Sequence, residues 1–301
     1  MSGPGTPTLD QLQIFLAIVD TGSFAGAARR MNRAVSAISY GIAQMEAQLG
    51  VNLFERAGTR RPQLSEAGRA LLAGARGIAE GVDGLRAVVR GLAQGLEAEV
   101  TLAVDVMLPA DRLGAVLRAF TVAYPTVPLR LHVEALGGVT AMVRDGTAAV
   151  GISGPLAAGV EGLECVRAGG VTMVPVAAPD HPLARLSPIP PGEARLHTQL
   201  VLTDRSRFTE GQDFAVLSPR TWRLGDLGAK HALLREGIGW GTMPLPMVAE
   251  DLATGRLLRL DLPDLTGGPY CFGATWRREA PPGPAGRWLL DRFIALGEAD
   301  G

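Results

Sequence analysis

Hydrophobic residues near the N-terminus recur at helical spacing. From residue 9 onward they lie three or four positions apart, which predicts an amphipathic helix that ends at Gly22. Ser23 is a favourable N-cap for a second, shorter helix, and Asn32 is one for a third helix that stops at Gly50. The apolar positions of the three helices are Leu12, Phe15, Leu16, Val19, Phe24, Ala27, Ala28, Met31, Val35, Ile38, Ile42, Met45 and Leu49. The pattern predicts three short helices that pack on one another.

The segment after the third helix contains two short apolar runs on either side of a basic turn. Residues 52–65, NLFERAGTRRPQLS, are typical of a β-hairpin, or wing. Together with small residues at positions 27 and 28, where the helices would cross, they predict a winged helix-turn-helix over residues 1–65. A small helical domain with ordinary surface arginines fits the same periodicity, so periodicity alone leaves both interpretations open.

A seven-residue repeat of apolar positions predicts a long helix over residues 66–97, with Ser65 as its N-cap. The steps between apolar residues alternate between four and three, as in a coiled-coil seam. The seam consists of Leu71, Ala75, Ile78, Val82, Leu85, Val89, Leu92 and Leu96. Glycines within this segment each cost roughly 0.8–1 kcal/mol relative to alanine. We therefore expect the helix to be stable when a partner helix packs on the seam; packing on its own chain is the alternative.

From residue 98 onward, short apolar strands alternate with amphipathic helices, which predicts an α/β domain with mostly parallel sheets and helices on both faces. Residues 163–169 and 171–179 are predicted as two separate strands, and a strand at 270–278 would return the chain to the first half. The domain is therefore expected to have two lobes joined by crossing strands. Lobe I comprises about residues 98–168 and 268–301, and lobe II about residues 169–267.

A cleft between the lobes is the expected small-molecule site, because ligands of open α/β sheets bind at the carboxyl ends of the strands. Strand-end residues are the candidate ligand contacts, and two tryptophans are candidate apolar walls. These residues are Asp105, Met107, Ser153, Thr203, Asp204, Trp222 and Trp240. The two acidic candidates would favour a polar or cationic ligand. Each candidate has an alternative role as a turn cap, a satisfied polar group or a core residue.

Composition narrows the functional classes. The chain has 301 residues, a net charge of −1 and 47% hydrophobic residues, as in a folded protein whose contacts with nucleic acid would have to be local. Residues 1–65 carry six arginines and four acidic residues, a local net charge of 6 − 4 = +2. Cys165 and Cys271 are the only cysteines, so no disulfide framework is expected. With neither a signal peptide nor an apolar run of membrane-spanning length, a cytoplasmic protein without membrane association is expected.

Motifs of the common enzyme classes do not occur in the sequence. We find no P-loop, G-x-S-x-G elbow or H-E-x-x-H motif. His132, His181, His197 and His231 are scattered without the spacing of metal ligands. We therefore expect no catalysis, no cofactor and no metal site.

Several runs of the chain together resemble the LysR-type transcriptional regulators. LDQLQIFLAIVDTGSFAGAARRMN, SAISYGIAQMEAQLGVNLFER and LSEAG occur in order at the spacing of that family's N-terminal domain, and HPLA and EGIGWGTMP resemble motifs of its effector domain. The resemblance implies an N-terminal winged helix-turn-helix, a long linker helix that dimerises the chain, and a two-lobed α/β effector-binding domain of periplasmic-binding-protein type. It also implies four partners: double-stranded DNA, a small-molecule effector, further copies of the chain in a homotetramer, and RNA polymerase.

The third helix would read DNA in such a regulator. Ser36, Ser39 and Tyr40 are the candidates for base edges. The candidates for phosphate contacts are Arg29, Arg30, Arg33, Arg56, Arg60 and Arg61. Val35 and Tyr40 depart from the family, which commonly has a polar residue and a basic residue there, so we do not expect the usual half-site contacts. A solute-binding or sensory protein that uses its N-terminal helices for protein contacts is the alternative.

Overall fold

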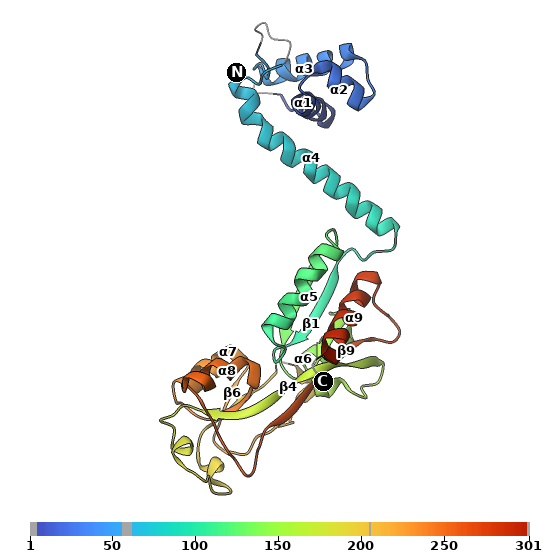
Figure 1. Ribbon diagram of the computed structural model, residues 1–301. Helices are drawn as coiled ribbons and strands as arrows, with labels where there is room; N and C mark the ends of the chain where they lie inside the picture. Colours follow the sequence, from blue (N-terminus) through green and yellow to red (C-terminus); the bar gives the residue numbers. More distant parts are fainter. Residues whose placement is uncertain (1–4, 56–61, 205, 300–301) are drawn as a thin grey trace. The chain divides into compact units, whose positions relative to one another are not determined.

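The computed structural model describes residues 5–55, 62–204 and 206–299 (Figure 1). By its internal contacts the chain divides into two compact units, Met1–Arg90 and Gly91–Gly301, each with its own hydrophobic core. The boundary lies inside the long helix α4 (Glu66–Ala93), seven residues before the predicted end of the linker at residue 97. Among the described residues, no helix combines the length and the apolar composition that a membrane span requires.

The N-terminal unit packs three short helices around Phe15. These helices are α1 (Leu9–Thr21), α2 (Phe24–Met31) and α3 (Val35–Leu49). Phe15 is fully buried, and its ring centroid lies 5.6 Å from that of Phe54. The predicted boundary between α1 and α2 is confirmed, because Gly22 ends α1 in the left-handed conformation (φ 68°) and the Ser23 side chain accepts a hydrogen bond from the backbone N–H of Gly26.

The turn between α2 and α3 differs from the prediction. Asn32 is not the N-cap of α3; it ends α2 in the left-handed conformation, with φ 50°. Ala34 occupies the N-cap position of α3 and makes no side-chain capping hydrogen bond. The tight turn needs a left-handed residue, which asparagine tolerates better than most. Val35 therefore begins α3 on its exposed side, 47% accessible, and is not part of the buried stripe.

The base of the predicted wing is a pair of short extended segments. Phe54 and Leu64 form an antiparallel bridge, and the backbone N–H of Glu55 donates to the carbonyl of Gln63 at 2.8 Å. The Glu46 carboxylate of α3 accepts a hydrogen bond from the N–H of Leu53 at 2.6 Å, which ties the wing to the helix. The tip of the wing, residues 56–61, lies outside the described residues.

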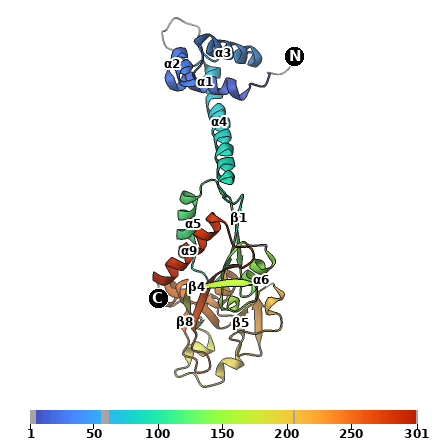
Figure 2. The ribbon, with the colours of Figure 1, turned by 90° about the vertical axis from the view of Figure 1, so that its right-hand side faces the viewer.

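The linker helix α4 is continuous from Glu66 to Ala93, as Figure 2 shows. Ser65 caps it as predicted, because its Oγ accepts from the N–H of Gly68 at 3.0 Å. The predicted seam is too long at both ends. Ala75 is buried in the core of the N-terminal unit, and Leu71 packs against that core. Beyond α4 the backbone N–H of Leu96 donates to the carbonyl of Gly91, and its side chain packs against the core of the C-terminal unit.

The C-terminal unit is built on a seven-stranded sheet in the order β2-β1-β3-β9-β4-β7, with β8 also paired to β4. Lobe I contains β1 (Val100–Asp105), α5 (Ala110–Ala123), β2 (Leu129–Glu134), α6 (Gly138–Asp145), β3 (Val150–Ser153) and α9 (Pro284–Ala299). Its strands β2, β1 and β3 are parallel. The strands that cross between the lobes are antiparallel to their neighbours, so the expectation of mostly parallel sheets holds only within a lobe.

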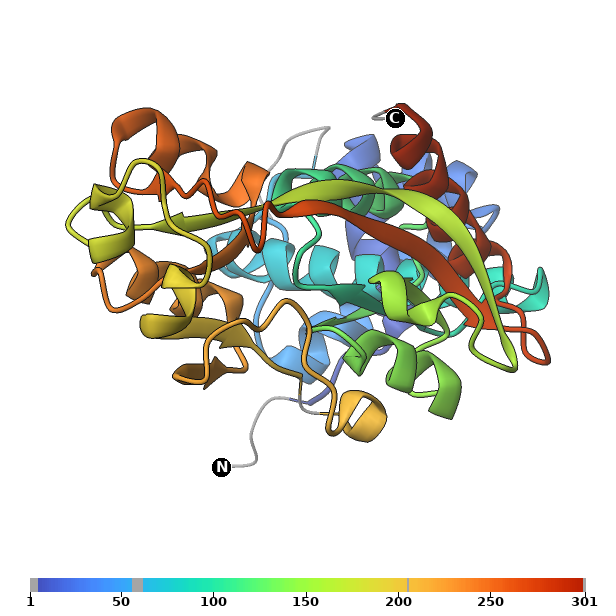
Figure 3. The same cartoon turned by 90° about the horizontal axis from the view of Figure 1, so that it is seen from below.

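Two long strands connect the lobes. They are β4 (Leu163–Ala177) and β9 (Gly268–Arg277), which run side by side in Figure 3. The two strands predicted on either side of Gly170 are therefore one strand, interrupted by an irregularity in register between Arg167 and Gly170. Gly169 has φ 85° there, and a Cβ at this position would lie 2.8 Å from the Cα of Gly297, so only glycine fits.

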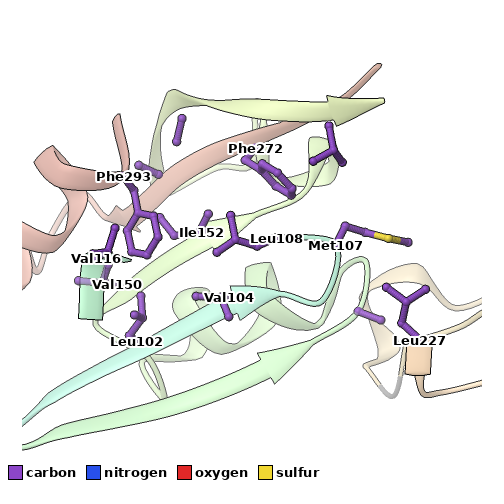
Figure 4. Packing of buried hydrophobic residues seen from close by; sticks show 14 of the residues in the cluster. Leu102, Val104, Met107, Leu108, Val116, Val150, Ile152, Leu227, Phe272 and Phe293 are labelled. Atoms are coloured by element: carbon purple, nitrogen blue, oxygen red, sulfur yellow. The ribbon is translucent and has the colours of Figure 1, made fainter. Parts of the chain in front are cut away.

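Lobe II carries a small second sheet and two helices. It contains β5 (Gln199–Leu202), β6 (Thr221–Leu224), α7 (Leu227–Arg235), β7 (Gly241–Pro244), α8 (Leu245–Thr254) and β8 (Leu258–Arg259). Strands β5 and β6 are parallel. The main core extends from lobe I into lobe II, and Figure 4 shows Met107 lying toward Leu227 of α7. This continuous packing holds both lobes around the strand ends.

Candidate functional site

One face of α3 is exposed and polar. Ile38, Ile42 and Met45 anchor the helix in the core of the N-terminal unit. The opposite side presents the exposed residues Ser36, Ser39, Tyr40, Ala43 and Gln44. Tyr40 is 66% accessible, and the Gln44 side-chain amide donates to its hydroxyl at 2.6 Å. The three base-edge candidates thus lie on one face that a nucleic acid can reach.

Arginines flank this face at the end of α2. Arg30 and Arg33 form exposed ion pairs with Asp20 and Asp10, at 3.0 and 2.8 Å. Among the described residues, Arg29 is exposed and forms no ion pair with a carboxylate. Exposed pairs contribute about 0–1 kcal/mol, so a phosphate can replace either aspartate at small cost. The other three phosphate candidates, Arg56, Arg60 and Arg61, lie outside the described residues.

A cavity of about 260 Å³ lies between the lobes at the carboxyl ends of the strands. Met107 and Leu136 line it from lobe I, where they follow β1 and β2. Leu202 and Lys230 line it from lobe II, and Tyr270 from the crossing strand β9. The position agrees with the rule that open α/β sheets bind ligands at their strand ends.

Three of the predicted ligand contacts lie at the ends of lobe I strands. Of these three, only Met107 lines the cavity. Asp105 is 1% accessible and lies behind the wall, where its carboxylate accepts hydrogen bonds from the N–H of Met107 and the hydroxyl of Tyr270, both at 2.8 Å. Ser153 is fully buried, and its Oγ has no hydrogen-bond partner among the described residues. Asp105 therefore positions cavity residues without being exposed to a ligand.

The remaining candidates belong to lobe II. Thr203 and Asp204 line a more polar hollow of about 530 Å³ that adjoins the cavity through shared residues such as Phe214. The expectation that two tryptophans form the walls of the cavity needs correction. Trp222 is 52% exposed on β6, and Trp240 is fully buried in lobe II with its indole N–H donating to the carbonyl of Ala194 at 3.0 Å. Phe214 and Tyr270 supply the aromatic wall instead.

Lys230 also lines the cavity and is not among the ligand contacts predicted from the sequence. It lies on α7, is 2% accessible, and donates from Nζ to the backbone carbonyl of Thr242 at 2.8 Å. Burial lowers the pKa of Lys230 to about 8, which leaves the ammonium mostly protonated at neutral pH. One signal was present in the sequence: Lys230 is the only lysine of a chain that otherwise uses arginine.

Asp105 also titrates unusually. Burial raises the pKa of Asp105 to about 6, although the hydrogen bonds from Met107 and Tyr270 act in the opposite direction. Within the described residues, no cluster of three or more His, Cys, Asp or Glu side chains could hold a metal ion.

Comparison with known proteins decides the family. Residues 93–297 match the family model of the LysR substrate binding domain, and residues 9–69 match that of the bacterial regulatory helix-turn-helix protein, lysR family. The chain is 31% identical over 294 residues to the probable HTH-type transcriptional regulator YhaJ of Escherichia coli (strain K12), and the alignment covers 96% of each. The chain belongs to the LysR family. It is a LysR-type transcriptional regulator with an effector-binding domain. The family matches do not favour the alternative of a solute-binding or sensory protein.

Solved structures share this architecture. The full-length LTTR LysG of Corynebacterium glutamicum aligns with 98% of this chain and 99% of its own, at 22% identity and a TM-score of 0.51. The same protein with bound effector Arg aligns with 96% of this chain and 98% of its own, again at 22% identity and a TM-score of 0.51. These similarities confirm the predicted fold: an N-terminal helix-turn-helix, a linker helix and a two-lobed α/β domain.

Proposed function

We propose that this LysR-type regulator binds promoter DNA as a dimer of dimers and that a small effector in the cavity between the lobes changes this binding. The observation that carries the DNA part is the exposed face of α3, with Ser36, Ser39 and Tyr40 opposite the buried Ile38 and Ile42. A helix anchored on one side and polar on the other fits the major groove. The proposed site of action is the cytoplasm, where promoter DNA lies.

Pairing of two copies would give the DNA site its symmetry. Ile78, Leu85, Val89 and Leu92 of α4 are exposed at seam positions, which supports a partner helix along this face. Two recognition helices would then enter successive major grooves about 34–36 Å apart on a pseudo-palindrome. Two such dimers form the proposed tetramer, and a change in their spacing would alter DNA bending and contact with RNA polymerase.

The cavity would couple the effector to this arrangement. An effector shifts the equilibrium between two arrangements only if it binds one of them more tightly. The cavity is lined from both lobes and from β9, so a ligand there would contact both lobes at once. The effector Arg bound to LysG supports a small-molecule effector for this chain as well.

A gel shift with the DNA upstream of the protein's own gene tests the DNA part. We expect salt-sensitive binding to an intergenic fragment, because phosphate contacts release counterions. Arg60→Ala should weaken binding to all sequences and reduce the salt slope by about 1. Ser39→Ala should reduce discrimination between the operator and random DNA about tenfold and leave the salt slope unchanged.

Two outcomes contradict this proposal. If no intergenic fragment is bound in a salt-sensitive manner, the proposal that the protein binds DNA is wrong. If Arg60→Ala and Ser39→Ala lower the affinity for operator and random DNA equally, the division into phosphate and base contacts is wrong.

A further inference from the structure

The charge at the effector cavity comes from a buried lysine. Of the 29 Lys and Arg residues in the chain, one is a lysine, and it lines this cavity. Of the three N–H donors of the Lys230 ammonium, one has a partner in the described structure, the carbonyl of Thr242. A lysine ammonium is a compact, strongly hydrated charge, so a buried one favours a ligand oxygen that can accept its remaining hydrogen bonds.

No carboxylate of the described residues acts as a counterion for this ammonium. Among the described residues Lys230 takes part in no ion pair, and burial is the single cause of its lowered pKa. The two acidic ligand candidates accept hydrogen bonds from other groups. Asp105 accepts from Tyr270 and Met107, and Asp204 accepts from the hydroxyls of Ser206 and Thr209 at 2.9 and 2.7 Å.

An unpaired buried cation destabilises the protein unless a partner arrives. A ligand carboxylate would supply that partner and accept the unused donors in a charge-assisted hydrogen bond. A cationic ligand would instead meet a like charge. The cavity therefore presents a positive charge to its ligand, whereas Asp105 and Asp204 suggested a negative charge from the sequence.

The rest of the cavity limits the size and polarity of the ligand. Met107, Leu136, Met173 and Leu265 are apolar, and Phe214 adds an aromatic surface. Gln199 is one polar residue of the lining, and its side-chain oxygen already accepts hydrogen bonds from the backbone N–H groups of Leu217 and Ser218. At about 260 Å³ the cavity is smaller than the ~300–1,000 Å³ typical of sites for drug-sized ligands.

We propose that the effector is a small monocarboxylate with an apolar body, whose carboxylate pairs with the ammonium of Lys230 while the body fills the space between Met107, Leu136 and Phe214. This inference rests on the proposed effector function of the cavity and names the chemical class that the cavity selects. Aromatic and short aliphatic carboxylates both meet the requirement.

The single lysine makes a direct test possible. Full-length protein labelled with ¹³C-lysine gives one lysine side-chain signal, which belongs to Lys230. We expect benzoate or hexanoate to shift this signal saturably, with a dissociation constant of about 1 mM or tighter. The bound carboxylate should also raise the pKa of Lys230, because it stabilises the charged form. Benzamide and benzylamine, which share the ring, should bind at least about tenfold more weakly than benzoate.

Matched variants assign the effect to Lys230. Lys230→Met should abolish the rise in melting temperature that benzoate causes in the wild type. Its own melting temperature should equal or exceed that of the wild type, because an unpaired buried charge is removed. Arg259→Met removes an exposed cation of the same lobe, outside the cavity lining, and should keep the benzoate response.

The inference is overturned if neither carboxylate shifts the Lys230 signal, if benzamide binds as well as benzoate, or if Lys230→Met keeps the response. Gel shifts with the operator separate this result from the proposed function. If carboxylates bind at Lys230 without changing operator affinity, the carboxylate site is supported and the proposed effector function is contradicted. A neutral or cationic metabolite that changes operator affinity and competes for the cavity leaves the effector function standing and overturns the carboxylate class.

Discussion

Asp105 links the chemistry of a single residue to the stability of the whole domain. Burial raises its pKa from 3.8 to about 6, so the folded protein holds this proton more tightly than the unfolded chain does. Between about pH 4 and 6 the contribution of Asp105 therefore makes the folded state less stable as pH rises. An asparagine side chain cannot ionise, so we expect Asp105→Asn to gain stability relative to the wild type across this window, by about 3 kcal/mol in total. Urea unfolding at a series of pH values measures the difference.

A second variant provides the control for this titration. The hydroxyl of Tyr270 donates to Asp105 and favours its charged form. Tyr270→Phe should therefore raise the pKa of Asp105 further and extend the upper end of the window to higher pH, while its lower end stays at the pKa of the unfolded chain. A difference between Asp105→Asn and the wild type that stays constant from pH 4 to 6 would show that Asp105 does not titrate in this way.

A place at a strand end was only a partial guide to the cavity lining. Met107 lines the cavity, whereas Asp105 and Ser153, which were predicted on the same ground, are buried and do not line it. Lys230 lies in the middle of α7, and its contact with the cavity depends on how that helix packs, which no local pattern specifies. Trp240, a candidate apolar wall, instead lies in the core, where its N–H donates to the carbonyl of Ala194, a residue distant in sequence.

At the scale of elements, Asp251 joins α7 to α8. It is 1% accessible, and its carboxylate accepts hydrogen bonds from His231 and Arg235 of α7. It also forms an ion pair with Arg256, whose Nε lies 2.8 Å from Oδ1 of Asp251. Burial would raise the pKa of Asp251, but the hydrogen bonds from Arg235 and His231 outweigh it and hold the pKa below its usual range. We expect Asp251→Asn to lower the free energy of unfolding by about 2 kcal/mol, less than for fully buried pairs because both arginines are partly exposed.

The matched control lies on the same helix. Glu250 pairs with Arg256 but is 81% exposed, so Glu250→Gln should cost less than about 0.5 kcal/mol. The loss in Asp251→Asn should shrink as pH falls below about 4, because the wild-type carboxylate then becomes protonated as well. Equal losses for the two variants at neutral pH would contradict a stabilising role for Asp251.

The interiors of elements were more predictable than their ends. The apolar repeat located α1, α3 and α4, because burial of one helix face leaves a period in the sequence. Their ends follow from contacts outside the helix. Asn32 has the side chain of an N-cap, yet the turn uses its left-handed backbone, and Leu96 continues the repeat, yet it packs on a different core.

The arrangement of the whole molecule depends on contacts between distant segments. Alternating strands and helices predicted two lobes, and the return of the last strand predicted their connection. The continuity of β4 was not predictable, because Gly169 and Gly170 mark a break in the local pattern. The register change at Arg167 and Gly170 shows that these glycines bend one strand where it crosses between lobes.

The exposed seam of α4 predicts that the intact regulator assembles through this helix. Ile78, Leu85 and Leu92 are spaced by seven residues, and 46–64% of each is exposed. We expect Leu85→Glu to place like charges opposite each other in the paired helices, to lower the oligomeric state, and to shorten the protected DNA segment. Glu80→Ala, exposed on α4 outside the seam, should change neither. Light scattering with size exclusion and operator footprinting measure both effects. If Leu85→Glu keeps the wild-type mass and footprint, another surface joins the subunits, and the exposed seam needs a different partner.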